Sequence, residues 1–204
     1  MKITKDLALV YGVLLGDGCL SKIRNHSFIS ITCNIHSDKA FLEKIKPFLE
    51  KLRQKPIKLY ERKKYGKIEI NFSDKKLFNQ FLKSSFPVGK KGPNLIVPDR
   101  MLPFLKEIIN GYFATDGSLV ITNNNGIKYP RLEFSSISKS LLQQVQKFLK
   151  TLEITGNIYI SKRYSNNWNT LYRLQINGKT NLKLFKNNIG FINPKHEIIC
   201  NKIL

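Results

Sequence analysis

Residues 9–20 read LVYGVLLGDGCL, an apolar run that stops abruptly on Gly16-Asp17-Gly18. The run predicts a helix from Leu7 to Gly16 whose last turn reaches Asp17, with Gly18 as the left-handed residue that ends it. A carboxylate is unfavourable there, because the free carbonyls and the macrodipole of a helix C-terminus favour cations. We therefore expect a positive group beside Asp17, unless the Asp-Gly pair simply forms a turn.

The same pattern returns about a hundred residues later. The stretch INGYFATDGSL at 109–119 repeats VYGVLLGDGCL at 10–20, so that Asp116 matches Asp17. Residues 138–152 then match residues 38–52, with apolar positions that fall on one face of a helix. The chain is therefore predicted to contain two copies of one unit of roughly a hundred residues.

Each copy is predicted to run helix, hairpin, helix, hairpin, helix. The hairpins are expected at 21–35, 57–72, 119–137 and 157–176, where apolar and polar residues alternate around turn-rich centres. One strand parity is apolar and the other is polar or basic, which is typical of a sheet with one open face. The stretch VGKKGPNLIVP is rich in Gly and Pro and joins the copies. The predicted domains are 1–87 and 99–204, with a linker at 88–98.

The composition indicates a globular protein with a polyanionic partner. Of 204 residues, 42% are hydrophobic, which is enough for a core, and 35 Lys and Arg against 14 Asp and Glu give a net charge of +21. Nucleic acid is favoured over a membrane, because no apolar run approaches the roughly 20 residues of a spanning helix. We expect an intracellular protein, since no signal-peptide cleavage site follows the N-terminal apolar run. The three cysteines show no zinc-site or disulfide spacing.

Both opening helices carry small residues that would let their backbones approach closely. These pairs are Gly12 with Gly16 and Gly111 with Thr115. If the copies pair about a pseudo-twofold axis, Asp17 and Asp116 come to lie side by side, and each raises the pKa of the other unless a cation neutralises them. Carboxylates and helix-end carbonyls form an all-oxygen ligand set that suits Mg²⁺. Such a site would serve in-line hydrolysis of a phosphodiester.

The two motifs resemble those of a known family. YGVLLGDG at 11–18 and NGYFATDG at 110–117 resemble the paired motifs of LAGLIDADG homing endonucleases, and the layout of nearly the whole chain resembles the monomeric double-motif members. The resemblance implies an α+β fold of two pseudosymmetric αββαββα repeats, which form a saddle of two antiparallel β-sheets with the motif helices packed at the centre. It also implies a site-specific, Mg²⁺-dependent endonuclease that cuts both strands of a long DNA target and leaves 3′ overhangs, with divalent cations such as Mn²⁺ as substitutes.

The resemblance also assigns roles to residues of the two motifs. The metal-binding carboxylates fall on Asp17 and Asp116, and the carbonyl ligands fall on Gly16 and Thr115. Many members place Gln or Lys at the end of the second strand to organise catalytic water. Here Asn34-Ile35-His36 and Ser135-Ser136 stand in that neighbourhood. His36 is the candidate water-organising residue, with surface packing as the alternative, and the two half-sites are expected to be unequal.

Contacts with DNA are expected from charged and aromatic residues of the open sheet faces, which read base edges or hold phosphates. For any single lysine the alternative is a solvated surface charge, and for the aromatic residues it is packing between strands. The candidates are Lys22, Arg24, Lys58, Tyr60, Arg62, Lys64, Lys67, Lys128, Arg131, Lys162, Arg163, Trp168 and Arg173.

Two other functions stay open. The chain could be an RNA-binding intron maturase, or a DNA-binding regulator that kept the fold without the chemistry. The presence of both Asp17 and Asp116 favours cleavage over the regulator. Double-stranded DNA is the expected partner, with intron RNA as the alternative and no membrane. We expect a monomer, because the two copies already supply both halves of the active centre.

Overall fold

The structure is a computed structural model that describes residues 3–161 and 169–204. The first copy consists of α1 (Lys5–Asp17), β1 (Gly18–Ile23), β2 (His26–Asn34), α2 (Ile35–Arg53), β3 (Leu59–Arg62), the 3₁₀ turn η1 (Lys63–Tyr65), β4 (Lys67–Ser73) and α3 (Lys75–Lys83). The second consists of η2 (Asp99–Phe104), α4 (Leu105–Asp116), β5 (Gly117–Asn124), β6 (Ile127–Ser136), α5 (Lys139–Thr151), β7 (Asn157–Ser161), β8 (Leu171–Asn177), α6 (Lys179–Asn188) and α7 (Pro194–Asn201). The predicted order αββαββα is confirmed in both copies.

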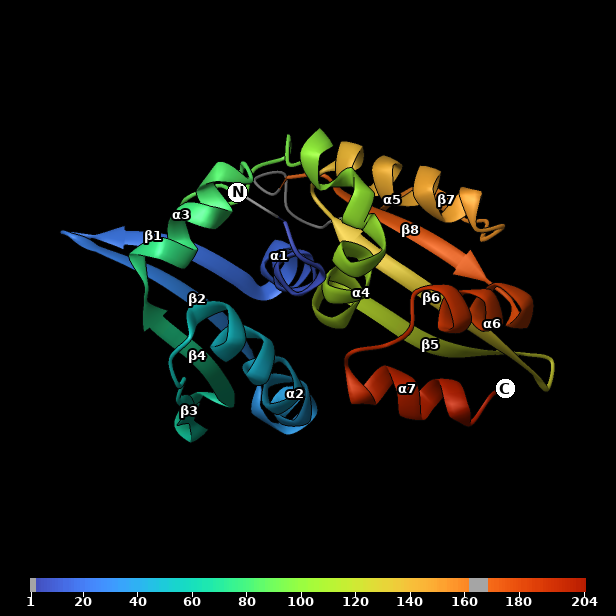
Figure 1. The fold of residues 1–204 in the computed structure, drawn as a ribbon. Helices are drawn as coiled ribbons and strands as arrows, with labels where there is room; N and C mark the ends of the chain where they lie inside the picture. Colours follow the sequence, from blue (N-terminus) through green and yellow to red (C-terminus); the bar gives the residue numbers. More distant parts are fainter. Residues whose placement is uncertain (1–2, 162–168) are drawn as a thin grey trace.

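The two copies form two antiparallel four-stranded sheets with the motif helices between them. The strand orders are β1-β2-β4-β3 and β5-β6-β8-β7, so the two sheets share one topology. Figure 1 shows α1 and α4 side by side at the centre, with one sheet on either side of the pair. The predicted α+β architecture of two repeats is therefore confirmed.

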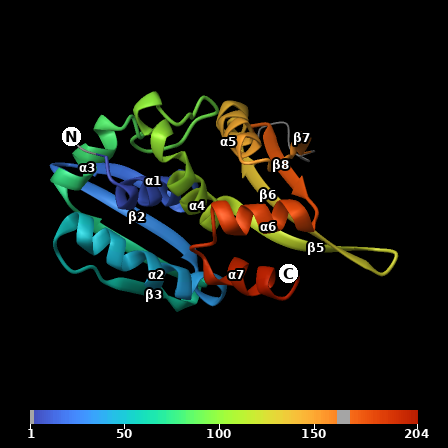
Figure 2. The ribbon, with the colours of Figure 1, turned by 45° about the vertical axis from the view of Figure 1, so that its right-hand side comes forward.

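Helices cover one face of each sheet and leave the other face open. In the first copy α2 packs on β2 and β4 and α3 packs on β2, and in the second copy α5 and α6 pack on β6 and β8 (Figure 2). The buried strand residues alternate as expected for such a layer, as in Ile68, Ile70 and Phe72 of β4. The intervening residues point to the face that no helix covers.

The helix α1 is apolar on all sides because it is buried on all sides. Every residue from Leu7 to Leu15 is buried between the two copies. Its N-terminus is capped by Thr4, whose hydroxyl oxygen accepts a hydrogen bond from the backbone N–H of Leu7 at 3.2 Å. In the described parts of the chain, no helix has both the length and the apolar character needed to cross a membrane.

Gly18 does not have the left-handed conformation that the sequence suggested. Its φ of −95° and ψ of 162° are extended, and Gly117 has the equivalent φ of −90° and ψ of 153°. Each helix therefore passes directly into a strand without a left-handed cap. Glycine is needed here for space, because a Cβ on Gly18 would collide with Leu14 and one on Gly117 would collide with Phe113.

One helix lies outside the repeat and was not predicted. The helix α7 follows the second copy and begins at Pro194, with the side chain of Asn193 accepting from the backbone N–H of Lys195 at 3.1 Å. Asn at the N-cap and Pro at the first helical position are a readable start signal. Alignment of the two copies did not predict this helix, because α7 has no match in the first copy.

Candidate active site

The helices α1 and α4 touch through their glycines. A Cβ on Gly12 would collide with the backbone of Ile108, and a Cβ on Gly111 would collide with the backbone of Leu9 and Val13. No side chain larger than hydrogen fits at either position. The small residues of both motifs therefore bring the two helix backbones together, and the ends of the helices follow.

Asp17 and Asp116 are the last residues of these two helices, and the structure brings them together. A Cβ built on Gly16 would lie 3.2 Å from the carboxyl carbon of Asp116, and the hydroxyl of Thr115 is closer still. The end of α1 is thus in direct contact with the end of α4. Both aspartates keep one side open to solvent.

Crowding shifts the acidity of both carboxyl groups. Loss of solvation, followed by the charge of Asp17, raises the pKa of Asp116 to about 7. Loss of solvation is also the main cause that raises the pKa of Asp17, and the charge of Asp38 adds to it. The pair therefore carries negative charge at an electrostatic cost, which a nearby cation would reduce.

A lysine from the linker supplies such a cation. The ammonium of Lys91 donates hydrogen bonds to the carbonyl oxygens of Leu14 at 3.1 Å and Leu15 at 2.8 Å, and also to that of Gly16. These are the unpaired carbonyls at the end of α1, where the macrodipole favours a positive charge. Burial lowers the pKa of Lys91, while the charges of Asp116 and Asp17 act in the opposite direction. The positive group expected beside Asp17 is thus present as a side chain.

The donor atoms also fit a divalent cation. Two carboxylates and nearby helix-end carbonyls are the hard oxygen ligands that Mg²⁺ prefers. Over residues 3–161 and 169–204, no group of three or more His, Cys, Asp or Glu side chains could hold a metal. A cation bound by Asp17 and Asp116 would complete its shell with water or substrate phosphate, as Mg²⁺ commonly does. The Gly16 carbonyl oxygen already accepts a hydrogen bond from Lys91.

The surroundings of Asp17 include a thiol that the sequence reasoning missed. The Sγ of Cys33 lies 3.6 Å from Oδ2 of Asp17, and burial raises the pKa of this thiol, so that it stays protonated and donates to the carboxylate. Cys33 continues the buried parity of Ile29 and Ile31 to the end of β2. That alternation could have placed it beneath α1.

The corresponding position in the second copy holds a hydroxyl group. Gly18 pairs with Ile31 and Gly117 pairs with Phe134, so the register aligns Cys33 with Ser136. Ser136 accepts a hydrogen bond from the backbone N–H of Ser138 at 3.0 Å and borders the same pocket as Asp116. The two half-sites are therefore chemically different.

A second polar cluster ties α7 to the end of α4. Asp38 accepts hydrogen bonds from the amide of Asn193 at 3.0 Å and from the ammonium of Lys195 at 2.7 Å. The same amide donates to the carbonyl oxygen of Ala114, in the last turn of α4, at 2.9 Å. Burial alone would raise the pKa of Asp38, but the hydrogen bonds from Lys195, Ser37 and Asn193 outweigh it and lower the pKa. Asp38 thus stays ionised and joins the two copies.

His36 lies on the first turn of α2 and is exposed. Its backbone N–H donates to the side chain of Asn34 at 2.8 Å, which caps the helix. The residue found against Asp17 is Cys33, three positions earlier. The role of His36 in organising water stays a prediction.

The strand registers place several DNA-binding candidates on the open faces. In the first sheet Tyr60 pairs with Glu69 and Arg62 pairs with Lys67, all on the parity opposite the core. In the second sheet Arg131 and Arg173 take the equivalent face, on either side of Glu133. These five candidates, Tyr60, Arg62, Lys67, Arg131 and Arg173, share the side of each sheet that no helix covers.

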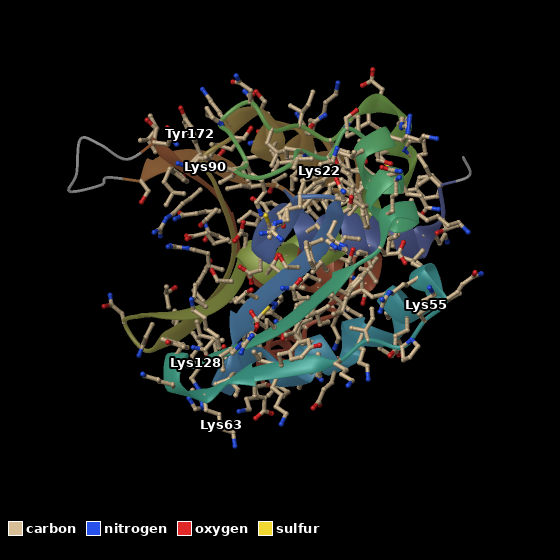
Figure 3. All side chains as sticks on the ribbon, turned by 90° about the vertical axis from the view of Figure 1, so that its left-hand side faces the viewer. Lys22, Lys55, Lys63, Lys90, Lys128 and Tyr172 are labelled. Carbon is tan, nitrogen blue, oxygen red and sulfur yellow. The ribbon has the colours of Figure 1, made fainter. Side chains whose placement is uncertain are left out.

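The other candidates lie elsewhere. Arg24 occupies the β1–β2 turn with φ 52°, Lys58 precedes β3, Lys64 lies in η1 and Lys128 lies near the tip of the β5–β6 hairpin. Lys22 has the parity of the covered face, and its ammonium lies 5.9 Å above the ring of Phe78. Lys162, Arg163 and Trp168 lie outside the described residues. Figure 3 shows labelled lysines on several sides of the molecule, so positive charge is not confined to the open faces.

Acidic side chains hold some of the open-face arginines in place. Arg62 donates to Glu69 at 2.8 Å, and Glu133 accepts from Arg173 at 3.0 Å and from Gln175 at 2.9 Å. Each open face therefore carries both donors and acceptors. Base edges present both kinds of group in the major groove.

Comparison with protein families finds a LAGLIDADG-like domain in each copy. Residues 103–190 match the LAGLIDADG-like domain, and residues 7–83 match the WhiA LAGLIDADG-like domain. Among curated proteins, the Probable translation initiation factor IF-2 of Methanocaldococcus jannaschii is 33% identical over 218 residues. The match covers all of this chain and 17% of that protein, so the chain spans only a small part of its relative.

Solved structures of similar fold come from homing endonucleases. Mesophilic variants of I-DmoI superpose with a TM-score of 0.65 at 18% identity, over 91% of this chain and 90% of theirs. I-DmoI in complex with DNA and Ca gives 0.63 at 19% identity, over 91% and 88%. The I-LtrWI LAGLIDADG homing endonuclease bound to target DNA gives 0.63 at 12% identity, over 98% and 90%. With a LAGLIDADG-like domain in each half and the fold of the double-motif enzymes throughout, this chain belongs to the LAGLIDADG family.

Proposed function

We propose that the chain is a site-specific DNA endonuclease that makes metal-dependent double-strand breaks with 3′ overhangs at a long target. The observation that carries the proposal is the meeting of Asp17 and Asp116 at the joined ends of α1 and α4. Placing two partly desolvated acids side by side is unfavourable for stability, so a structural role is a poor explanation for both. The match to LAGLIDADG-like domains in both halves supports the same conclusion.

In this proposal one group of residues would bind DNA and another would bind a divalent cation. The open-face residues Arg62, Lys67, Arg131 and Arg173 would contact phosphates and base edges along the duplex. Asp17 and Asp116 would hold Mg²⁺, which supplies Lewis acidity for phosphodiester hydrolysis when it is bound. With a duplex lying across both sheets, their position at the contact between the copies would bring one acid near each strand. A monomer would be sufficient, because both acids belong to one chain.

Cleavage of a randomised duplex library by the full chain tests this function. With Mg²⁺ or Mn²⁺, we expect a defined set of cut molecules whose sequenced ends carry a common target and 3′ overhangs. EDTA should abolish the products. A library that stays uncut with Mg²⁺, Mn²⁺ and Ca²⁺ would contradict the nuclease.

Two observations favour a second candidate function, a DNA-binding protein that does not cut. The ammonium of Lys91 already neutralises the end of α1, and the first copy matches the WhiA LAGLIDADG-like domain. Both functions predict duplex binding that weakens steeply with salt, since a protein contacting about 6–10 phosphates loses roughly 10³–10⁵ in affinity between about 50 and 200 mM salt. Tight, sequence-selective binding without cut molecules would identify the second.

A further inference from the structure

Lys91 reaches the end of α1 from outside the repeat. It belongs to the linker between the copies, more than seventy residues along the chain from α1. The linker is attached at the first sheet by Gly89, whose backbone N–H donates to the carbonyl of Leu20 at 2.7 Å. The backbone thus holds the ammonium over the end of α1.

The ammonium also borders an open space on the side of the second acid. A pocket of about 470 Å³ is lined by Gly16, Lys91, Asp116, Ser135 and Ser136, among others. Lys91 is half-buried there, while its neighbour Lys90 lines the same pocket and is exposed. One lysine of the pair is therefore built into the junction, and the other faces solvent.

We propose that Lys91 is a tethered cation that occupies the α1 carbonyl end of the junction and must leave Gly16 before a divalent cation binds fully there. The inference rests on the proposed function in one respect, since it takes Asp17 and Asp116 as the residues that hold the ion. Three hydrogen bonds to carbonyls of one helix end fix the ammonium. Two like charges cannot share this site at low cost.

Two consequences follow for the protein without DNA. Replacing Lys91 by Met removes a positive charge beside the ion site, so the affinity for Mn²⁺ should rise by roughly tenfold or more. The same change leaves the α1 carbonyls without their donor, so in EDTA the unfolding temperature should fall. Added Mn²⁺ should restore more of that loss in Lys91→Met than it adds to wild type.

The test compares Lys91→Met with Lys90→Met and Lys91→Arg in the full chain. Mn²⁺ affinity is measured by calorimetry and unfolding temperature by circular dichroism, each with and without EDTA. Lys90→Met should match wild type, and Lys91→Arg should keep the weaker Mn²⁺ affinity because the charge remains. Equal Mn²⁺ affinities in Lys91→Met and Lys90→Met, or no detectable binding by either, would overturn the inference.

A second measurement uses the unmodified sequence, in case Lys91→Met does not fold. Acetylation by acetic anhydride, followed by mass spectrometry, reports how accessible each amine is. Ca²⁺ should raise the reactivity of Lys91 relative to Lys90, because the ion displaces the ammonium from Gly16. Unchanged reactivity of Lys91 with saturating Ca²⁺ would overturn the inference.

These results separate the inference from the nuclease. DNA cleavage by wild type, together with unchanged Mn²⁺ affinity in Lys91→Met, keeps the enzyme and overturns the tethered cation. Tighter Mn²⁺ binding by Lys91→Met, together with no DNA cleavage by wild type, keeps the tethered cation and overturns the nuclease.

Discussion

The two motif helices end in the same residue type but are held by different partners. The carbonyls at the end of α1 bind a charged group, the ammonium of Lys91. The Ala114 carbonyl near the end of α4 binds a neutral group, the amide of Asn193. Both partners come from segments outside the repeat, the linker and the residue before α7. The repeated unit therefore supplies the paired acids, and the unrepeated segments add to the difference that Cys33 and Ser136 already make between the two half-sites.

The close contact between α1 and α4 depends on glycines at matching positions of the two copies. Gly12→Leu and Gly111→Leu should each lower the free energy of unfolding by about 3 kcal/mol or prevent folding, because each side chain would meet the opposite helix backbone. Urea denaturation measures the effect. Gly92→Ala is the control, since a Cβ there meets nothing within 4 Å. A stable Gly111→Leu would contradict the backbone contact between the helices.

The helix α7 introduces a pH dependence from outside the repeat. Burial, followed by the charge of Lys195, lowers the pKa of His196 to about 4, against the opposing charge of Asp38. Its ring packs against Phe113 at 4.8 Å between centroids. Because the unfolded chain binds the proton near pH 6.5, acidification from about pH 6.5 to 4 favours unfolding by up to about 3 kcal/mol.

The variant His196→Leu isolates this contribution. Urea denaturation of wild type and of His196→Leu across that pH range should show the difference in stability shrinking or reversing as the pH falls. The carboxyl groups titrate in both proteins, so the comparison removes their contribution. Parallel pH profiles of the two proteins would show that His196 is not held neutral by burial.

The ion pair between the copies should contribute less. Lys195→Met leaves the buried carboxylate of Asp38 without its cation, and the expected loss is about 1–2 kcal/mol. This is below the range for fully buried pairs, because the side chain of Lys195 is 35% exposed. Urea denaturation measures this loss, and Lys202→Met, at an exposed position, serves as the control. Equal stability of the two variants would show that the ion pair between Asp38 and Lys195 does not stabilise the contact between α2 and α7.

The sequence predicted the repeated elements and the paired acids, but the contacts that Lys91 makes from the linker could not be predicted from it. Matching Asp17 with Asp116 predicted the paired helices and the meeting of the acids, and the alternation of apolar and polar residues predicted both sheets. The rule that a helix C-terminus favours cations predicted a positive group beside Asp17, but the sequence reasoning assigned that role only to a metal ion and not to a lysine. The role of Lys91 was not predicted, because a linker side chain that contacts the end of a helix in another segment follows no periodic pattern. Cys33 was readable from strand alternation, and Asn193 was readable as a helix cap.

The open faces should show the smallest differences. Glu133→Gln weakens hydrogen bonds from Arg173 and Gln175, whereas Glu69→Gln affects only the more exposed Arg62. We expect stability losses below about 1 kcal/mol for both, with Glu133→Gln the larger, because these pairs are near the surface. Both changes should tighten non-specific duplex binding, since each removes a negative charge. Fluorescence anisotropy with a labelled duplex measures this, and weaker binding by both variants would contradict the assignment of these faces to DNA.

The acids at the two helix ends are tested most directly by Asp17→Asn and Asp116→Asn. In the library assay, with thermal stability and duplex binding measured on the same preparations, both variants should lose double-strand cleavage and keep binding, because an amide is a much poorer Mg²⁺ ligand than a carboxylate. Asp99→Asn, at an exposed position in η2, should cut like wild type. Full cutting by either Asp17→Asn or Asp116→Asn, or loss of cutting only in step with unfolding, would contradict a nuclease centre built from these two carboxylates.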